Sequence, residues 1–294
     1  MINRAKIVNG LQRTLRTAGW VLQKDPAVAA GDLLYEGYPE RSLAERRFYN
    51  IGAGVFQHRY WTNIDYNSGY YGAVLPKGYI DHNLMSLDAF PVEDNVAELV
   101  YCSHVIEHIT NQAALKLISE AHRILKTGGL LRIVVPDARL AYEACLRGDR
   151  RFFYWVEPHS RPRIVRGMYR IPPKNASIEQ LFLHLVAGQL SEIDIDQDVE
   201  RKFSTEEIAM ILETRSMEEA LDFFRRRCVF KDQYAGTHIN WWAANKLDHY
   251  FREAGFSSPR LSGFGQSRAA PLRDTSLFDS THPKISLYME AVKE

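Results

Sequence analysis

Tyr49-Asn50-Ile51-Gly52-Ala53-Gly54 is the stretch that decides the fold, and Asp65 follows Gly54 after a short interval. The apolar run before Gly52 has the length of a buried strand, and the glycines let the backbone turn sharply and approach a ligand closely. A dinucleotide-binding loop needs a third glycine where this chain has Gln57, and its acidic residue lies about 20 residues further on. The spacing therefore disfavours nicotinamide cofactors and predicts a very short crossover, or none, between the first two strands.

Short apolar runs alternate with helical patterns around this loop, as they do in parallel sheets joined by crossovers. We expect strands near residues 47–51, 62–65, 79–82, 97–102, 130–135, 258–264 and 285–292. The clearest helix covers residues 111–126, where the apolar positions share one face and two glycines follow. A later helix is expected near residues 241–254. The pattern predicts an α/β fold with a mostly parallel sheet.

The chain divides into four predicted segments. Residues 1–44 form an N-terminal helical segment, and its basic amphipathic part over 1–24 docks on the body, lies on a membrane surface or forms a dimer contact. Residues 45–140 form the core, 141–235 a helical insertion and 236–294 the C-terminal part of the core. Helix-start signals in the insertion are Ser204 with Glu207 and Ser216 with Glu219. Aromatic and arginine side chains of the insertion form either a substrate lid or a solvated face. Examples are Phe152, Phe153, Tyr154, Trp155, Arg161, Arg163, Arg166 and Tyr169.

Composition narrows the classes of partner. Lys and Arg number 37 against 36 for Asp and Glu, so the net charge of +1 gives no pull toward nucleic acid. The three cysteines form no disulfide or zinc pattern. The sequence has no transmembrane run and no N-terminal export signal. We therefore expect a cytoplasmic protein that acts on a small molecule or a glycan.

Several motifs in order, from the glycine loop through Asp65 and Ser103 to His108 and on to Gly255-Phe256, resemble the class I S-adenosylmethionine-dependent methyltransferases. The chain is similar to bacterial predicted methyltransferases associated with surface-glycan biosynthesis. The resemblance covers residues 46–140 well and the C-terminal part moderately. It implies a Rossmann-like, doubly wound, mostly parallel seven-stranded sheet with an antiparallel last strand.

The resemblance also implies where S-adenosylmethionine binds. The glycine loop contacts the methionine part, Asp65 accepts hydrogen bonds from the ribose hydroxyls, and Asn83 with Leu84 meets the adenine. Asn83 departs from the commoner aspartate. The full set of predicted cofactor-binding residues is Asn50, Gly52, Ala53, Gly54, Asp65, Tyr66, Asn83, Leu84 and Ser103.

The segment Ser103 to His108 is the most informative for mechanism. His104 is the first candidate base, and His238 the second. Asp137, after the fifth strand, either faces substrate or begins a helix. No metal is favoured, but His104, Glu107, His108 and His238 are the alternative ligand set for a divalent ion, by analogy with certain methyltransferases that have a carboxylate at the first position.

A third interpretation is that Glu107 and His108 only cap and orient the next helix. His184 lies among apolar residues and is interpreted as a core histidine. The favoured function is O-methylation of a sugar, glycan or small-molecule hydroxyl with a histidine base. The alternatives are a metal-dependent O-methyltransferase of a natural product and a non-catalytic, cofactor-binding partner subunit. The oligomeric state stays open.

Overall fold

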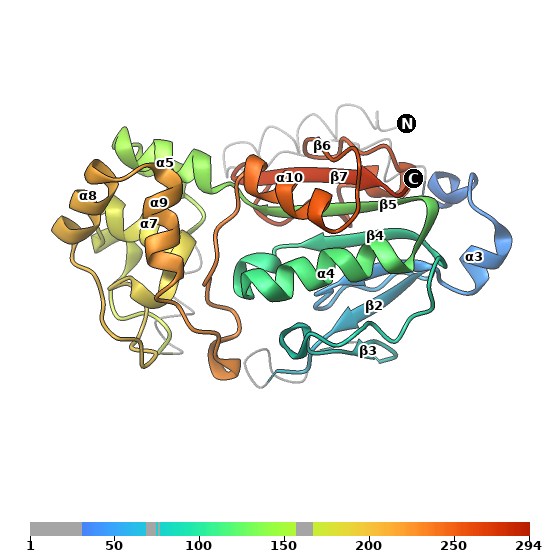
Figure 1. Ribbon diagram of the computed structural model, residues 1–294, viewed down its shortest axis with the longest axis horizontal. Helices are drawn as coiled ribbons and strands as arrows, with labels where there is room; N and C mark the ends of the chain where they lie inside the picture. The colour runs from blue at the N-terminus through green and yellow to red at the C-terminus, as the bar shows by residue number, and fades with distance from the viewer. Residues whose placement is uncertain (1–30, 69–74, 76, 157–166) are drawn as a thin grey trace, which may run out of the picture.

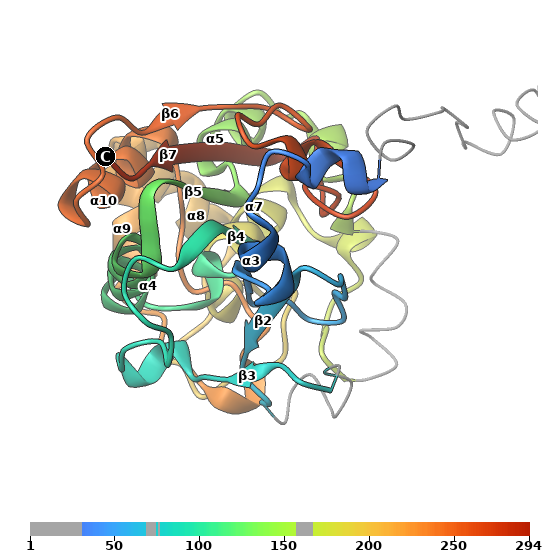
Figure 2. The same cartoon turned by 90° about the vertical axis from the view of Figure 1, so that its right-hand side faces the viewer.

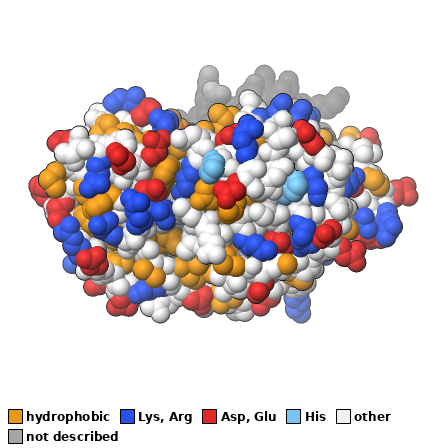
Figure 3. Space-filling model, viewed as in Figure 1, with side chains coloured by type: hydrophobic (Ala, Val, Ile, Leu, Met, Phe, Trp, Pro, Cys, Tyr) orange, Lys and Arg blue, Asp and Glu red, His pale blue; other side chains and the backbone are white. Residues whose placement is uncertain are grey.

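The computed structural model describes residues 31–68, 75, 77–156 and 167–294. The predicted amphipathic stretch over 1–24 lies outside these residues, as do Arg161, Arg163 and Arg166. Within the described ranges, no helix combines the length and the apolar character needed to span a membrane. On the face in Figure 3, Lys and Arg side chains lie among Asp and Glu side chains, in keeping with the balanced composition.

Seven strands form one sheet in the order β3-β2-β1-β4-β5-β7-β6. Neighbouring strands from β3 to β5 pair in parallel, whereas β7 is antiparallel to both β5 and β6. This topology confirms the predicted fold class. The bounds are β1 Phe48–Ile51, β2 Trp61–Asp65, β3 Ile80–Asp81, β4 Ala97–Ser103, β5 Leu125–Pro136, β6 Arg260–Leu261 and β7 Ser286–Val292.

Two amphipathic helices cover one face of the sheet. They are α4 (Asn111–Ile124) and α10 (Ala244–Glu253), whose apolar sides join the strands in one core. The predicted helix over 111–126 ends two residues early, because Leu125 is already extended and pairs with Ala97 of β4. Helix α10 begins three residues later than predicted, because Trp242 bridges to Asp137 in extended backbone.

Short helices and an aromatic layer cover the other face. Figure 2 shows α4 and α10 on one side of the sheet and the blue N-terminal part of the described chain on the other. The short elements are η1 (Gly31–Tyr35), α3 (Glu40–Ala44) and η8 (Ala270–Arg273). Phe48, Trp61 and Phe278 form part of the aromatic core there. Residues 52–60, all described, form turns and no helix, which confirms the short crossover between β1 and β2.

The insertion forms a helical layer with its own apolar core beyond the ends of the parallel strands (Figure 1). Capping boxes begin two of its helices as the sequence predicts, with Ser204 paired to Glu207 and Ser216 paired to Glu219. The first helix already begins at Ala138, before the predicted boundary at residue 141. The helices are α5 Ala138–Leu146, α7 Ile178–Ala187, α8 Thr205–Thr214 and α9 Met217–Arg225.

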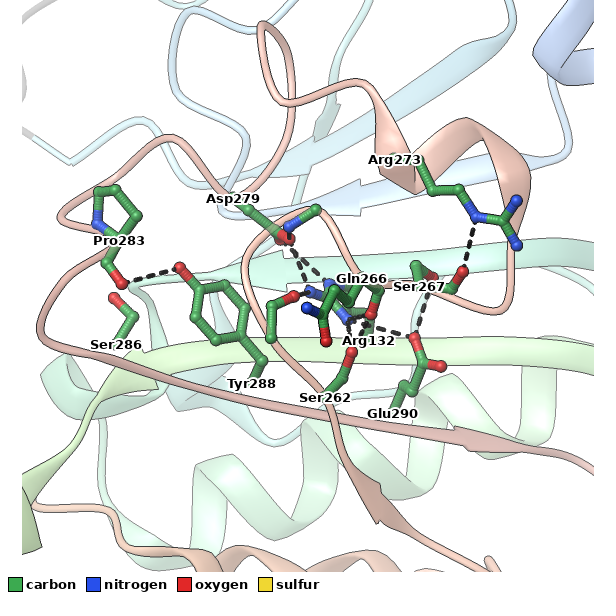
Figure 4. A network of polar contacts seen from close by, with 12 residues as sticks. Arg132, Ser262, Gln266, Ser267, Arg273, Asp279, Pro283, Ser286, Tyr288 and Glu290 are labelled. Carbon is green, nitrogen blue, oxygen red and sulfur yellow. Dashed lines mark hydrogen bonds and ion pairs between the residues drawn. The ribbon is translucent and has the colours of Figure 1, made fainter. Parts of the chain in front are cut away.

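A buried arginine fastens the C-terminal loop to the sheet (Figure 4). Arg132 of β5 is fully buried and forms ion pairs with Asp279 at 2.6 Å and Glu290 at 3.2 Å. It also donates a hydrogen bond to the Gly263 carbonyl oxygen. The strand predicted over 258–264 is only two residues long, because the chain there turns to place its carbonyl groups against this guanidinium.

Candidate functional site

The glycine loop follows β1 at the point where the strand order reverses. From β1 the chain builds outward to β2 and β3, and then returns to place β4 on the other side of β1. Such a reversal opens a crevice at the carboxyl ends of the two central strands, where open α/β sheets bind ligands. Ile51 and Cys102 are aligned neighbours in β1 and β4, so Gly52 and Ser103 follow side by side. The topology therefore places the glycine loop beside the segment that begins at Ser103.

Backbone geometry at the loop depends on glycine. Gly52 and Gly54 have φ angles of 66° and 54°, in the left-handed region that other residues rarely adopt. A Cβ atom at Gly52 would overlap the Val105 side chain, whereas the space beside Gly54 is open. Asp65 ends β2, and its Oδ2 accepts a 2.6 Å hydrogen bond from the Gly54 N–H. The Tyr66 N–H donates to Oδ1 at 2.7 Å, so backbone groups hold both carboxylate oxygens.

A cavity of about 380 Å³ lies against this loop, and we call it the first cavity. Its volume falls within the roughly 300–1,000 Å³ that is typical of small-molecule sites. Seven of the nine predicted cofactor-binding residues line it, namely Gly52, Gly54, Asp65, Tyr66, Asn83, Leu84 and Ser103. Asn50 and Ala53 are not among its lining residues, and Asn50 is buried within β1.

The side of the first cavity beyond β3 combines an amide with apolar side chains. Asn83 caps a short helix, η2 (Leu84–Ser86), by accepting a 2.9 Å hydrogen bond from the Met85 N–H. Leu84, Met85 and Ile109 supply an apolar wall of the kind that a flat aromatic ring requires. Burial raises the pKa of Asp65, although its two backbone hydrogen bonds oppose that shift. The donors, acceptors and apolar wall fit an adenosine-bearing cofactor.

His104 stands where the first cavity meets a second one. It directly follows β4 and has a φ angle of 55°, a strained conformation for a non-glycine residue. Such strain is common at functional sites. Its Nδ1 lies 3.2 Å from Glu107 Oε1, and its Nε2 lies 2.9 Å from the Ser286 hydroxyl. Among the described residues, His104, His108 and Thr281 line both cavities.

Glu107 is a deeply buried carboxylate surrounded by histidines. Glu107 is 1% exposed, and it lies on a single turn of 3-10 helix rather than on a continuous α-helix. Burial alone raises the pKa of the Glu107 carboxyl, but His104, His108 and His238 outweigh it and lower that pKa to about 2. Neither oxygen of the Glu107 carboxylate has a hydrogen-bond partner among the described residues, although His104 Nδ1 lies 3.2 Å from Oε1. The site thus holds a full negative charge beside imidazole groups.

His238 follows the insertion in the sequence and lies beside the Glu107 carboxylate. Donor atoms of Glu107, His108 and His238 lie within 4.8 Å of one another, an arrangement that can hold a metal ion. His238 Nδ1 lies 2.6 Å from the Leu185 carbonyl oxygen, so Nδ1 carries the proton and Nε2 the lone pair. Burial, with help from His108, lowers the pKa of His238 to about 3. The structure therefore brings together the predicted alternative ligands, with His104 outside the tightest group.

The second cavity has a volume of about 190 Å³ and lies between the sheet and the insertion. Core residues His104, Glu107, His108 and His238 form one side, and Tyr169, His184 and Asp194 of the insertion also line it. His184 is buried and hydrogen-bonded to Tyr169 and Asp194, in agreement with its interpretation as a core histidine, and it also lines this cavity. Trp155 of the predicted lid lines the same cavity.

Asp137 is not brought into either cavity. Its Oδ1 accepts hydrogen bonds from the Arg139 and Leu140 N–H groups and so caps α5. Of the two interpretations of Asp137, the geometry agrees with the helix cap. We therefore leave it out of the catalytic groups considered below.

Several lining residues had no recognisable sequence motif. Thr281 and His282 lie in an irregular stretch before β7, and they reach the site because β7 pairs beside β5. Asp194 lies in a loop where aspartates alternate with isoleucines, a pattern that resembles an exposed strand. Only the pairing of Asp194 with His184 distinguishes it from its neighbours.

Comparison with known proteins supports the core of this site. Residues 58–133 match the family model described as a methyltransferase domain, which is about a quarter of the chain. The match runs from just before β2 into β5 and does not reach the insertion. No curated protein matches the chain.

Solved structures show only distant likeness. A Thermotoga maritima protein, described as an S-adenosylmethionine-dependent methyltransferase and possible histamine N-methyltransferase, is 12% identical, with 91% of this chain and 95% of that chain covered and a TM-score of 0.39. A Mesorhizobium loti methyltransferase is 13% identical, with coverage of 90% and 97% and a TM-score of 0.37. An arsenic(III) methyltransferase from Chlamydomonas reinhardtii is 15% identical, with coverage of 92% and 73% and a TM-score of 0.34.

The fold follows from the observed strand order rather than from these low similarities. The match with the methyltransferase model supports the predicted enzyme class, a methyltransferase, and the first cavity fits the predicted cofactor, S-adenosylmethionine.

Proposed function

We propose that this methyltransferase transfers the methyl group of S-adenosylmethionine to a hydroxyl oxygen of a small neutral acceptor, with sugars as the favoured class. The observation that carries the proposal is the shared position of His104 on both cavities. A cofactor in the first cavity and an acceptor in the second then meet at a side chain able to take a proton.

The first cavity supplies the cofactor side of this arrangement. When bound, S-adenosylmethionine supplies an electrophilic methyl group on a positively charged sulfur. Each oxygen of Asp65 accepts one backbone N–H and keeps a lone pair for a ribose hydroxyl. The left-handed turns at Gly52 and Gly54 keep side chains away from the ligand. These residues bind and orient the cofactor, and orientation accounts for much of the rate of a two-substrate reaction.

His104 is the favoured base, and His238 is not. His104 Nδ1 lies 3.2 Å from the Glu107 carboxylate, and this contact favours the neutral tautomer with its proton on Nδ1 and its lone pair on Nε2. The Ser286 hydroxyl contacts that Nε2 and fixes the direction of the ring. His238 holds a proton too weakly for this role, because its pKa is lowered to about 3 and an effective base has a pKa near the working pH.

The cluster of Glu107, His108 and His238 supports a second candidate, a metal-assisted reaction. Its donor atoms are close enough to share one ion, and the Leu185 carbonyl fixes the His238 ring as backbone carbonyls often do for metal-binding histidines. A divalent ion held there would act as a Lewis acid on the acceptor hydroxyl. The His104 base needs no metal, so a chelator separates the two candidates.

The second cavity favours a neutral acceptor. Its described lining contains histidines, threonines, Tyr169 and Trp155, but no lysine or arginine to neutralise a phosphate or carboxylate. Its volume of about 190 Å³ suits a compact ring better than a large ligand. The resemblance to methyltransferases of surface-glycan biosynthesis agrees with a sugar as that ring.

The test begins with calorimetric titration of S-adenosylhomocysteine and continues with labelled S-adenosylmethionine. Methyl glycosides, catechol and small amines are offered as acceptors, each with and without EDTA. We expect S-adenosylhomocysteine to bind and label to enter glycosides, with no loss in EDTA. Transfer to amines alone overturns the proposal. Loss of activity in EDTA that Mg²⁺ or Mn²⁺ restores selects the metal-assisted candidate.

A cytoplasmic location is part of the same proposal. All three cysteines are unpaired, as expected in a reducing compartment. Fractionation of the cells that make the protein tests this location.

A further inference from the structure

We propose that Asp194, His184 and Tyr169 form a hydrogen-bonded relay that recognises a second hydroxyl group of the acceptor. This inference rests on the proposed function and narrows its acceptor class from any alcohol to a polyol. His104 contacts the hydroxyl that is methylated, and Tyr169 binds another hydroxyl of the same molecule from the insertion side.

The relay is a continuous chain of three buried polar side chains. Asp194 Oδ2 lies 2.8 Å from His184 Nδ1, and His184 Nε2 lies 3.0 Å from the Tyr169 hydroxyl. The three residues are 5%, 7% and 5% exposed, respectively. The Asp194 carboxylate only accepts, so Nδ1 donates to it and the lone pair of His184 is on Nε2. The Tyr169 proton is therefore donated to His184.

That direction of hydrogen bonding decides what Tyr169 offers to the cavity. With its proton donated to His184, the phenolic oxygen keeps two lone pairs, so beside its other contacts it can accept a hydrogen bond on the side that faces the cavity. It therefore accepts a hydrogen bond and binds groups that carry a proton, such as a sugar hydroxyl. Because Asp194 polarises His184, the bonds along the chain strengthen one another in this buried setting.

The fold holds the relay rigidly. Tyr169 and Asp194 form an antiparallel bridge, with the Arg170 N–H donating to the Ile193 carbonyl at 2.7 Å. His184 projects from α7, whose side chains form part of the insertion core. A Cβ atom at Gly188 would lie 2.8 Å from Asp194 Oδ2, so the glycine makes room for the carboxylate. Groups placed on such supports bind with defined geometry.

A second donor beside the relay also points to a polar ligand. The indole N–H of Trp155 is buried and has no hydrogen-bond partner among the described residues. The Trp155 ring lies nearly parallel to the His184 ring, at an interplanar angle of 20°, and both residues line the second cavity. A buried donor without a partner is costly, and a ligand oxygen in this cavity would satisfy it. A polyol supplies both the proton for Tyr169 and the oxygen for Trp155.

Variants of the full-length protein test the relay. Tyr169→Phe removes one oxygen and keeps the ring, and Tyr154→Phe is the matched control on the exposed surface of the insertion. The probes are methyl glycosides and their monodeoxy analogues, with kcat and KM measured for each. S-adenosylhomocysteine titration and thermal melting show that each variant is folded and binds cofactor.

We expect Tyr169→Phe to lower kcat/KM for the intact glycoside about 10- to 100-fold, the loss of one buried hydrogen bond. Removing one particular hydroxyl from the glycoside should give the same loss in the wild type and none in Tyr169→Phe. His184→Gln and Asp194→Asn should lower kcat/KM in the wild type but not in the Tyr169→Phe background.

Three results are decisive against the relay. It is overturned if kcat/KM of Tyr169→Phe for the intact glycoside stays within twofold of that of Tyr154→Phe. It is also overturned if the loss in kcat/KM from Tyr169→Phe and the loss from removing a hydroxyl are additive for every deoxy analogue. It is also overturned if wild-type protein that binds S-adenosylhomocysteine methylates catechol but no glycoside. In each of these cases O-methylation stands and only the relay fails, whereas absence of transfer to any hydroxyl refutes the proposed function itself.

Discussion

The Asp65 carboxylate accepts a 2.6 Å hydrogen bond from the Gly54 N–H and thereby joins the end of β2 to the glycine loop after β1. The two residues that first indicated a ligand site thus hold each other in place. The bond also closes the loop without an intervening helix, which is why the spacing between them is short.

Asp65→Asn should weaken S-adenosylhomocysteine binding about 10- to 100-fold, because an amide offers one acceptor oxygen where the carboxylate offers two. Asp81→Asn is the matched control. Asp81 ends the neighbouring strand β3, accepts a 3.3 Å hydrogen bond from the Asn67 N–H and does not line the first cavity. Calorimetric titration measures both, and equal weakening by the two variants contradicts the ribose role of Asp65.

Gly52→Ala should cost more stability than Gly54→Ala. Both positions have a left-handed φ, but only at Gly52 does a Cβ overlap Val105. The extra cost for Gly52→Ala should be about 1–3 kcal/mol, the usual penalty for overpacking. Urea denaturation of the two variants gives the difference directly. A second change, Val105→Ala, should recover part of it, and no recovery means that the overlap is not the cause.

His104→Ala should lower kcat at least 100-fold while S-adenosylhomocysteine still binds, since a general base contributes roughly 10²- to 10⁴-fold. His249→Ala is the control, because His249 lies exposed on α10 beside Glu253. Methyl transfer is measured with the acceptor found in the screen. If His104→Ala keeps a tenth or more of the wild-type kcat, His104 is not the base.

Arg132→Met should destabilise the protein by about 3–5 kcal/mol, because it leaves two buried carboxylates, Asp279 and Glu290, without their cation. Arg139→Met removes a half-exposed arginine 3.6 Å from Glu218 and should change stability by no more than about 1 kcal/mol. Chemical denaturation compares the two. A similar small effect for both means that the buried network does not fasten the C-terminal loop.

The titration of Lys246 should make stability rise as the pH is raised from about 7 to about 9. Burial, with help from Arg225, lowers the pKa of Lys246 to about 7 from the 10.5 of an unperturbed lysine. Between these values the unfolded chain holds a proton that the folded protein has released, so raising the pH favours the folded state. Urea midpoints at pH 7 and pH 9 measure the rise. Lys246→Met should reduce it, and an unchanged rise contradicts the assigned pKa.

The local sequence pattern was enough to predict most of the strands, because the length of each short apolar run and the glycine or aspartate that ends it are visible in the sequence. The same pattern predicted the capping boxes at Ser204 and Ser216, which depend on residues only three apart. It misplaced the ends of α4, α10 and β6. Those ends depend on partners elsewhere in the chain, such as the pairing of Leu125 with Ala97.

The sequence by itself determined the glycine loop, the acidic end of β2 and the short crossover between them, and it indicated the cofactor class. These features depend on backbone conformation and on the spacing of nearby residues, which are local properties and do not require contacts with distant parts of the chain. Only the tertiary structure decided that Asp137 caps a helix, that His238 lies beside Glu107 and that His184 is hydrogen-bonded to Tyr169 and Asp194. A polar side chain forms hydrogen bonds with the partners that the packing of distant elements brings within reach. For these residues, the partners depend on how the helices of the insertion pack beyond the ends of the strands.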